Sequence, residues 1–149
     1  MAYSFSGFIG TLEPVQRICT RFILARPVSL GQDLFLVPLT DELREQMTSK
    51  AVAEPVPGFE LLSGAMEPVA ISASMLGPLA YVEVTHWKGE GSEAGIIWEE
   101  GVRLRTIRFG QGVINTVLKH LGCTANEGSD EFTTLGFGRR RFTDDWLTE

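Results

Sequence analysis

A period of two runs through Leu79-Ala80-Tyr81-Val82-Glu83-Val84-Thr85-His86-Trp87. Successive side chains of a strand point to opposite faces of a sheet, so this pattern predicts a strand with Tyr81 and Glu83 on one face. Val82 and Val84 then lie on the other face. Two positions are open to Glu83: the solvated face of the sheet, or a polar place in a pocket.

Two further strands follow, at 94–98 and 102–109, and each comes after a turn that contains glycine. Short turns between neighbouring strands favour antiparallel pairing, so the sequence predicts a β-meander over about 79–109. In the third strand Arg103 and Arg105 alternate with apolar residues. We therefore expect one side of that strand to face water.

Helical spacing of apolar residues predicts about four helices, and short apolar runs bounded by glycine or proline predict two more strands. The helices are expected at about 12–23, 41–51, 68–75 and 112–121, and the strands at 3–9 and 34–37. The run 34–37 is apolar throughout, which is typical of a strand buried on both faces. Thr143 is expected to cap a short turn that docks Trp146. These elements predict an α+β domain with a mixed or antiparallel sheet of five or six strands.

Composition supports a single domain, 1–149, because 149 residues with 44% hydrophobic and 21% charged content are typical of one globular core. The chain begins without a basic region followed by an apolar segment. Its longest apolar run, 34–39, is far shorter than the roughly 20 residues of a membrane span. We therefore expect a cytoplasmic protein with reduced cysteines and no membrane segment.

Metal and cofactor chemistry have little support. The chain has two cysteines and two histidines: Cys19, His86, His120 and Cys123. A zinc site would need all four, and no paired Cys-x-x-Cys or His-Glu-x-x-His spacing is present, so we expect no metal. The segment 110–112 could present backbone amides to an anion, but Asn115 occupies the third glycine position of a dinucleotide motif. We expect no cofactor.

Charge indicates the kind of partner. The formal net charge is −6, which disfavours general binding to nucleic acid or anionic lipid because such binding needs a basic face. The segment 136–142 nevertheless places three of the 13 basic residues between aromatic residues, with acids close behind. Three interpretations are open: a protein-facing surface, an RNA contact, or a solvated tail.

The C-terminal half carries scattered motifs that are typical of one family. They are Gly77-Pro78-Leu79-Ala80-Tyr81-Val82-Glu83 leading to Trp98, Ile114-Asn115 with Leu118 and Leu121-Gly122, Asp130-Glu131-Phe132, Gly136-Phe137-Gly138-Arg139, and Thr143-Asp144-Asp145-Trp146. With these residues the chain resembles a family of small uncharacterised bacterial proteins. The resemblance implies a bacterial cytosolic origin and no mechanism. By analogy, small acidic proteins of this kind are similar to toxin-neutralising immunity proteins, which present charge to a cationic partner.

The sequence therefore predicts a non-enzymatic protein-binding module, with an immunity protein that neutralises a basic toxin as its specific form. The predicted partner-binding residues are Glu127, Asp130, Glu131, Asp144 and Asp145 as an acidic surface, Trp146 as an anchor, and Arg139, Arg140 and Arg141 to fix orientation. One alternative is a small hydrolase or transferase that uses Glu83, His86 and Cys123 in a cleft beside the meander. The other is an RNA-associated protein that uses 139–141. The sequence gives no oligomeric state.

Overall fold

The computed structural model describes residues 3–48, 54–87, 90–110 and 112–147. Its strands are β1 (Tyr3–Gly10), β2 (Val28–Gly31), β3 (Leu34–Pro38), β4 (Leu79–Trp87), β5 (Glu90–Glu99) and β6 (Val102–Gly110). Its α-helices are α1 (Leu12–Arg21), α2 (Asp41–Thr48), α3 (Glu67–Ala73), α4 (Val113–His120) and α5 (Glu131–Thr134). Three 3₁₀ turns complete the chain: η1 (Ser74–Leu76), η2 (Phe137–Arg139) and η3 (Thr143–Leu147).

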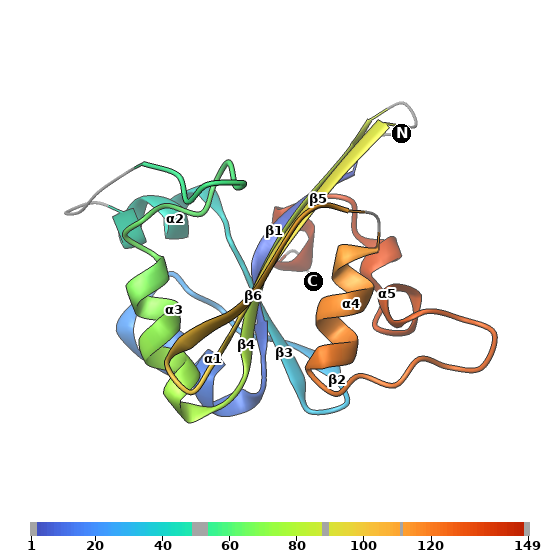
Figure 1. Cartoon of the computed structure of the whole chain (residues 1–149), viewed down its shortest axis with the longest axis horizontal. Coiled ribbons are helices and arrows are strands. Elements are labelled where there is room, and N and C mark those ends of the chain that lie inside the picture. The colour runs from blue at the N-terminus through green and yellow to red at the C-terminus, as the bar shows by residue number, and fades with distance from the viewer. Residues whose placement is uncertain (1–2, 49–53, 88–89, 111, 148–149) are drawn as a thin grey trace.

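The six strands form one sheet in the order β2-β3-β1-β4-β5-β6, and every neighbouring pair is antiparallel. Helices α1, α2 and α3 cover one face, and α4, α5 and the C-terminal turns cover the other (Figure 1). The α+β fold class and the meander are therefore confirmed, and of the two sheet types left open the antiparallel one is present.

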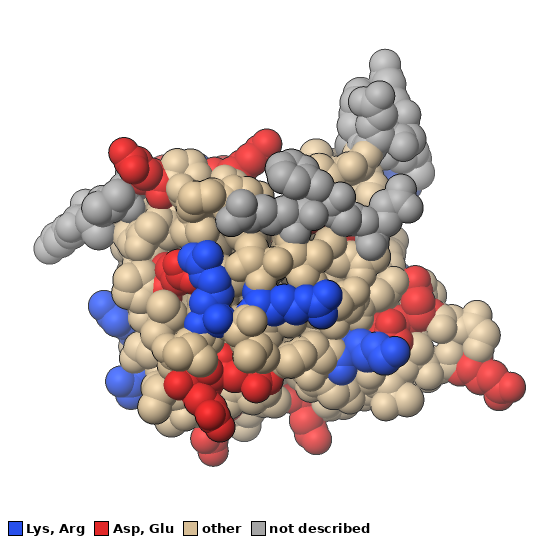
Figure 2. Space-filling view, viewed as in Figure 1, with Lys and Arg blue, Asp and Glu red and all other residues tan. Residues whose placement is uncertain are grey.

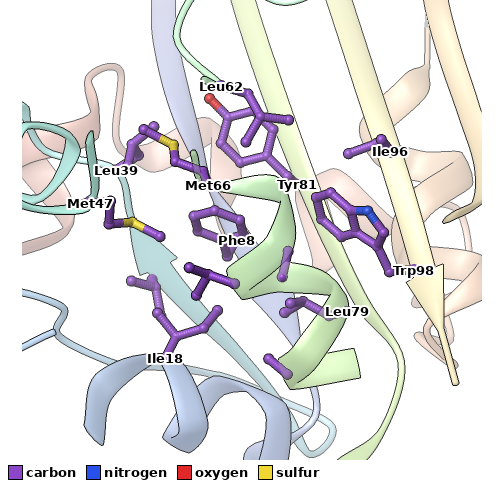
Figure 3. Packing of buried hydrophobic residues seen from close by; sticks show 14 of the residues in the cluster. Phe8, Ile18, Leu39, Met47, Leu62, Met66, Leu79, Tyr81, Ile96 and Trp98 are labelled. Carbon is purple, nitrogen blue, oxygen red and sulfur yellow. The ribbon is translucent and has the colours of Figure 1, made fainter. Parts of the chain in front are cut away.

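Strand alternation divides the core into two clusters, one on each face of the sheet. Phe8, Tyr81 and Trp98 belong to the cluster under α1–α3, part of which Figure 3 shows. Residues one position along, such as Ile9 and Ile97, belong to the cluster under α4 and α5. Neighbouring residues of a central strand therefore contribute to different core clusters, and each central strand is apolar on both faces. The apolar run 34–37 predicted this for its own strand.

Helix α4 lies close to β5 because Gly95 has no side chain. A Cβ atom at Gly95 would lie 2.8 Å from Val113 Cγ1 and 3.1 Å from Val117 Cγ2. The apolar face of the predicted helix, including Val113, Ile114 and Val117, is buried against the sheet. This contact fixes one wall of the second core cluster.

Several element boundaries differ from the sequence prediction. Helix α1 ends at Arg21, and Ile23, which was expected on its apolar face, is 85% exposed. Strand β2 was not predicted, because it is a short edge strand in which exposed residues alternate with half-buried ones, and its sequence has no continuous apolar run. The four-residue α5 was also missed. The second helix was predicted to extend to Ala51, which lies outside the described residues.

The prediction for the third meander strand was wrong in one respect. A β-bulge shifts the β5–β6 register, so that Arg103 is aligned with Trp98 and Arg105 with Ile97. Since Trp98 and Ile97 point to opposite faces, the bulge sends the two arginines to opposite faces as well. Val102 and Leu104 are 57% and 51% exposed. This part of β6 therefore has no buried side.

Among the described helices, none combines the length and the apolar content that a bilayer crossing requires.

Candidate functional site

The first candidate site is the outer edge of β6. This nine-residue strand pairs with β5 alone, so its other side carries backbone N–H and C=O groups that meet no strand in the described part of the chain. The view in Figure 1 looks onto this edge, and Figure 2 shows basic side chains across the middle of the same face. An unpaired edge with exposed Val102 and Leu104 is a template for adding another strand.

Glu67 at the start of α3 holds β6 in place. Its carboxylate accepts hydrogen bonds from Trp98 Nε1 at 3.0 Å and from Arg103 Nε at 2.7 Å, and Arg103 Nη2 also donates to it. Burial disfavours the ionised carboxylate, but the bonds from Arg103 and Trp98 outweigh it and hold the Glu67 pKa below its usual value. Glu67 thus ties the edge strand to the helical layer on the α1–α3 face, while Ile107 packs against the core cluster on the other face.

The opposite face of β6 carries a different arginine. Arg105 is exposed, and its register with Ile97 directs it toward the α4 side of the sheet. The strand VRLRTIRFG contains three arginines and no acidic residue, although the whole chain has a net charge of −6. The sequence of β6 is therefore basic on an acidic protein, although Glu67 offsets the charge of Arg103.

The second candidate site is a groove of about 810 Å³ on the α1–α3 side of the sheet. Its wall is the segment 58–61, and its floor consists of the ends of β1, β4 and β5. Glu83 lies in it and accepts hydrogen bonds from the backbone N–H groups of Leu61 (2.6 Å) and Glu60 (3.1 Å). Of the two positions that the sequence left open for Glu83, the structure shows the pocket.

The Glu83 carboxyl is only partly solvated. Burial raises its pKa, the backbone N–H groups of Leu61 and Glu60 oppose this, and the nearby Glu60 charge adds to the rise. Beside it the fully buried Tyr81 hydroxyl lies close to Ser6 and Glu83, yet makes no hydrogen bond of ordinary geometry. Burial, followed by the Glu83 charge, raises the Tyr81 pKa.

The three residues proposed for a hydrolase are not brought together. Glu83 faces the α1–α3 layer, whereas Cys123 belongs to the cluster under α4 and α5. His86 lies on that second face too, with Nε2 3.8 Å from Glu93 Oε2. Burial raises the pKa of the Cys123 thiol, and the Glu131 charge adds to this effect, so the thiolate nucleophile is disfavoured.

The residues considered for a metal site do not come together, and the backbone position considered for an anion is already occupied. No three His, Cys, Asp or Glu side chains gather as metal ligands within the ranges that the structure describes. His120 instead contacts Glu99, with Nε2 2.6 Å from Oε1. At the start of α4, where an anion could bind, Glu93 accepts hydrogen bonds from Gly112 N at 3.1 Å and Ile114 N at 3.4 Å. The chain's own carboxylate thus fills that position.

Two members of the predicted acidic surface also support local structure. Asp130 caps α5 by accepting a hydrogen bond from Thr133 N at 2.8 Å, and it also accepts one from Asn115 Nδ2. Asp145 accepts one from Phe142 N at 3.1 Å. Glu127 and Asp144 are exposed, and Glu131 is half-buried.

The predicted anchor and arginine cluster also have structural contacts. Trp146 is only 5% exposed and packs against Phe5 and Phe137, so it docks the tail as expected but cannot serve as an exposed anchor. The Arg140 guanidinium lies over its ring, 4.7 Å from the centroid. Arg139 and Arg141 are exposed. Two of the three arginines therefore remain on the surface.

Comparison with protein-family models, with curated proteins and with solved structures found no match for this chain. The resemblance in the C-terminal half therefore rests on its sequence motifs alone.

Proposed function

We propose that this protein is a protein-binding module that takes an added β-strand from its partner along β6. The observation that carries the proposal is the nine-residue edge strand, paired on one side only and bearing exposed Val102 and Leu104. In strand addition the backbone hydrogen bonds supply affinity, while alternate side chains supply specificity. The other edge strand, β2, has four residues and offers a shorter ladder.

The occupant is an extended acidic segment of another protein. Arg105 projects to the α4 face of β6, so acidic side chains on that face of an added strand would meet a positive charge, whereas on the other face the Arg103 charge is already paired with Glu67. A second copy of this chain fits less well, because antiparallel pairing of two β6 strands would place three arginines from each copy in one ladder with no acid. Charge complementarity thus selects an acidic partner.

The test uses two short probe peptides, one that alternates glutamate with valine and one in which lysine replaces glutamate. Titration followed by fluorescence anisotropy should show that the acidic peptide binds at least about tenfold more tightly, equivalent to about 1.4 kcal/mol. Hydrogen exchange should show new protection of β6 amides, because their outward N–H groups become bonded to the added strand.

Arg105→Glu should reverse the preference between the two peptides. The matched control is Arg26→Glu, which makes the same charge change at an exposed position outside β6 and should leave the preference intact. Equal binding of both peptides to the unmodified protein, or protection confined to other elements, would contradict the proposal. Concentration-dependent β6 protection without peptide would show self-association instead.

The predicted acidic surface provides a second protein-binding candidate, for a basic partner such as a toxin. Glu127 and Asp144 are exposed, and neither forms an ion pair with another residue in the part of the chain that the structure describes. If this surface is used, Glu127→Lys with Asp144→Lys should abolish binding of a lysine-rich probe protein and leave the acidic peptide bound at β6. Unchanged binding of the lysine-rich protein would eliminate this candidate.

A further inference from the structure

The groove beside Glu83 is a second candidate site, separate from β6. Its volume of about 810 Å³ lies within the range of small-molecule sites in proteins. It is lined by residues from three strands and by the segment 58–61, so both its floor and its wall are built by the fold. A ligand here would contact the sheet directly and would not compete with a strand at the β6 edge.

The charge of the described lining is negative. Glu60 and Glu83 are its ionisable residues, and the Glu60 charge acts on Glu83. Arg44 lines a neighbouring hollow of about 160 Å³, where its charge acts to lower the Tyr81 pKa, and it forms no ion pair with any residue that the structure describes. The groove therefore has two carboxylates and no cationic side chain among its described walls, which disfavours an anionic ligand.

Neutral residues also line the groove around the two carboxylates. Ser4, Ser6 and Ser92 line the groove, and Phe59, which is 6% exposed, belongs to its wall. The fully buried Tyr81 hydroxyl lies next to Ser6 and Glu83 without a hydrogen bond of ordinary geometry. It is fully buried and does not line the groove, so a ligand would meet Glu83 and the serines rather than this hydroxyl.

We propose that this groove binds a small organic amine in its protonated form, with the ammonium at Glu83 and the apolar part of the ligand against Phe59. An ammonium carries three donors, which suits carboxylate and hydroxyl oxygens. Aromatic rings also attract cations and pack against apolar groups. A divalent metal fits less well, because no three metal-competent side chains meet in the described residues.

The experiment compares phenethylamine with 2-phenylethanol and 3-phenylpropanoate, which keep the ring and change the charge of the head group. Calorimetric titration should give the tightest binding for the amine, weaker binding for the alcohol and none for the carboxylate. Glu83→Gln should weaken amine binding about tenfold, as expected for loss of one charge-assisted bond. Glu13→Gln, at an exposed position on α1, makes the same charge change and should have no effect.

A second variant keeps the proposal testable if Glu83→Gln disturbs the fold. Ser92 is exposed at the groove and lies opposite Thr85 in the sheet, so Ser92→Lys would place a competing ammonium near Glu83 and abolish amine binding. Equal affinity for amine and alcohol, or an undiminished amine affinity in both variants, would overturn the proposal. Arg105→Glu should not affect amine binding, so failure at this groove is distinguishable from failure at β6.

Discussion

At the scale of single residues, Glu83 shows what alternation can and cannot predict. The period of two assigned it correctly to the same face as Tyr81, and both lie on the α1–α3 side. Its burial could not be predicted, because it depends on the segment 58–61, which folds back over β4. The alternation of residues along a strand gives the face on which a side chain lies, whereas a loop distant in sequence decides whether that side chain is exposed to solvent.

The stability of the protein should depend on the ionisation of Glu83. In the folded protein the Glu83 pKa is raised above its ordinary value of 4.5. The folded state therefore holds this proton more tightly than the unfolded state, and the resulting stabilisation is fully present below pH 4.5. It is lost as the pH rises through the raised pKa. Relative to Glu83→Gln, the unmodified protein should therefore lose unfolding free energy as the pH rises from 4.5 through the raised pKa. The change should be less than about 1 kcal/mol, because the carboxylate keeps some solvent contact.

Urea unfolding of both proteins across this pH range would measure the effect. Glu13→Gln controls for the change in net charge, since it removes one carboxylate from an exposed position. A difference between the unmodified protein and Glu83→Gln that stays constant with pH would show that Glu83 has the same pKa in the folded and unfolded states.

At the scale of elements, the meander strands and the helix at 112–121 were predictable, whereas the short edge strand β2 and the four-residue α5 were not. The helix at 112–121 and the meander strands have strong periodicity, and they form close to the expected positions. Helix α5 has four residues, too few for a period to appear, and it depends on the Asp130 cap. The sequence therefore placed Asp130 on a binding surface when its carboxylate is engaged within the fold.

Charge reversal should separate the structural acids from the exposed ones. Asp130→Lys removes the α5 cap and should lower the unfolding free energy by about 1 kcal/mol. Asp144→Lys makes the same charge change at an exposed residue of η3 and should alter it by less than about 0.5 kcal/mol. Thermal melts of the two variants would measure this difference. Equal melting temperatures would show that the cap contributes nothing measurable.

At the scale of the whole molecule, the first strand and the last 3₁₀ turn share one core. Ser4 N donates to the Arg141 carbonyl at 2.8 Å, and Ser6 N donates to Thr143 Oγ1 at 3.1 Å. Trp146 then packs against Phe5 of β1. The sequence predicted one domain and the docking of Trp146. It did not predict that the tail docks on β1, because this contact joins residues at nearly opposite ends of the chain and no local sequence pattern indicates it.

The two faces of the sheet should unfold together, because central strands contribute side chains to both core clusters. Each cluster contains a buried reporter: Trp98 under α1–α3 and Trp146 under the C-terminal turns. In a Trp87→Phe background, Trp98→Phe leaves Trp146 as the fluorophore, and Trp146→Phe leaves Trp98. Within each variant, the urea midpoint from fluorescence should equal the midpoint from far-ultraviolet circular dichroism, even though the substitutions lower stability. If the Trp146 transition preceded the loss of secondary structure while the Trp98 transition coincided with it, the C-terminal layer would be a separate unit that unfolds before the sheet.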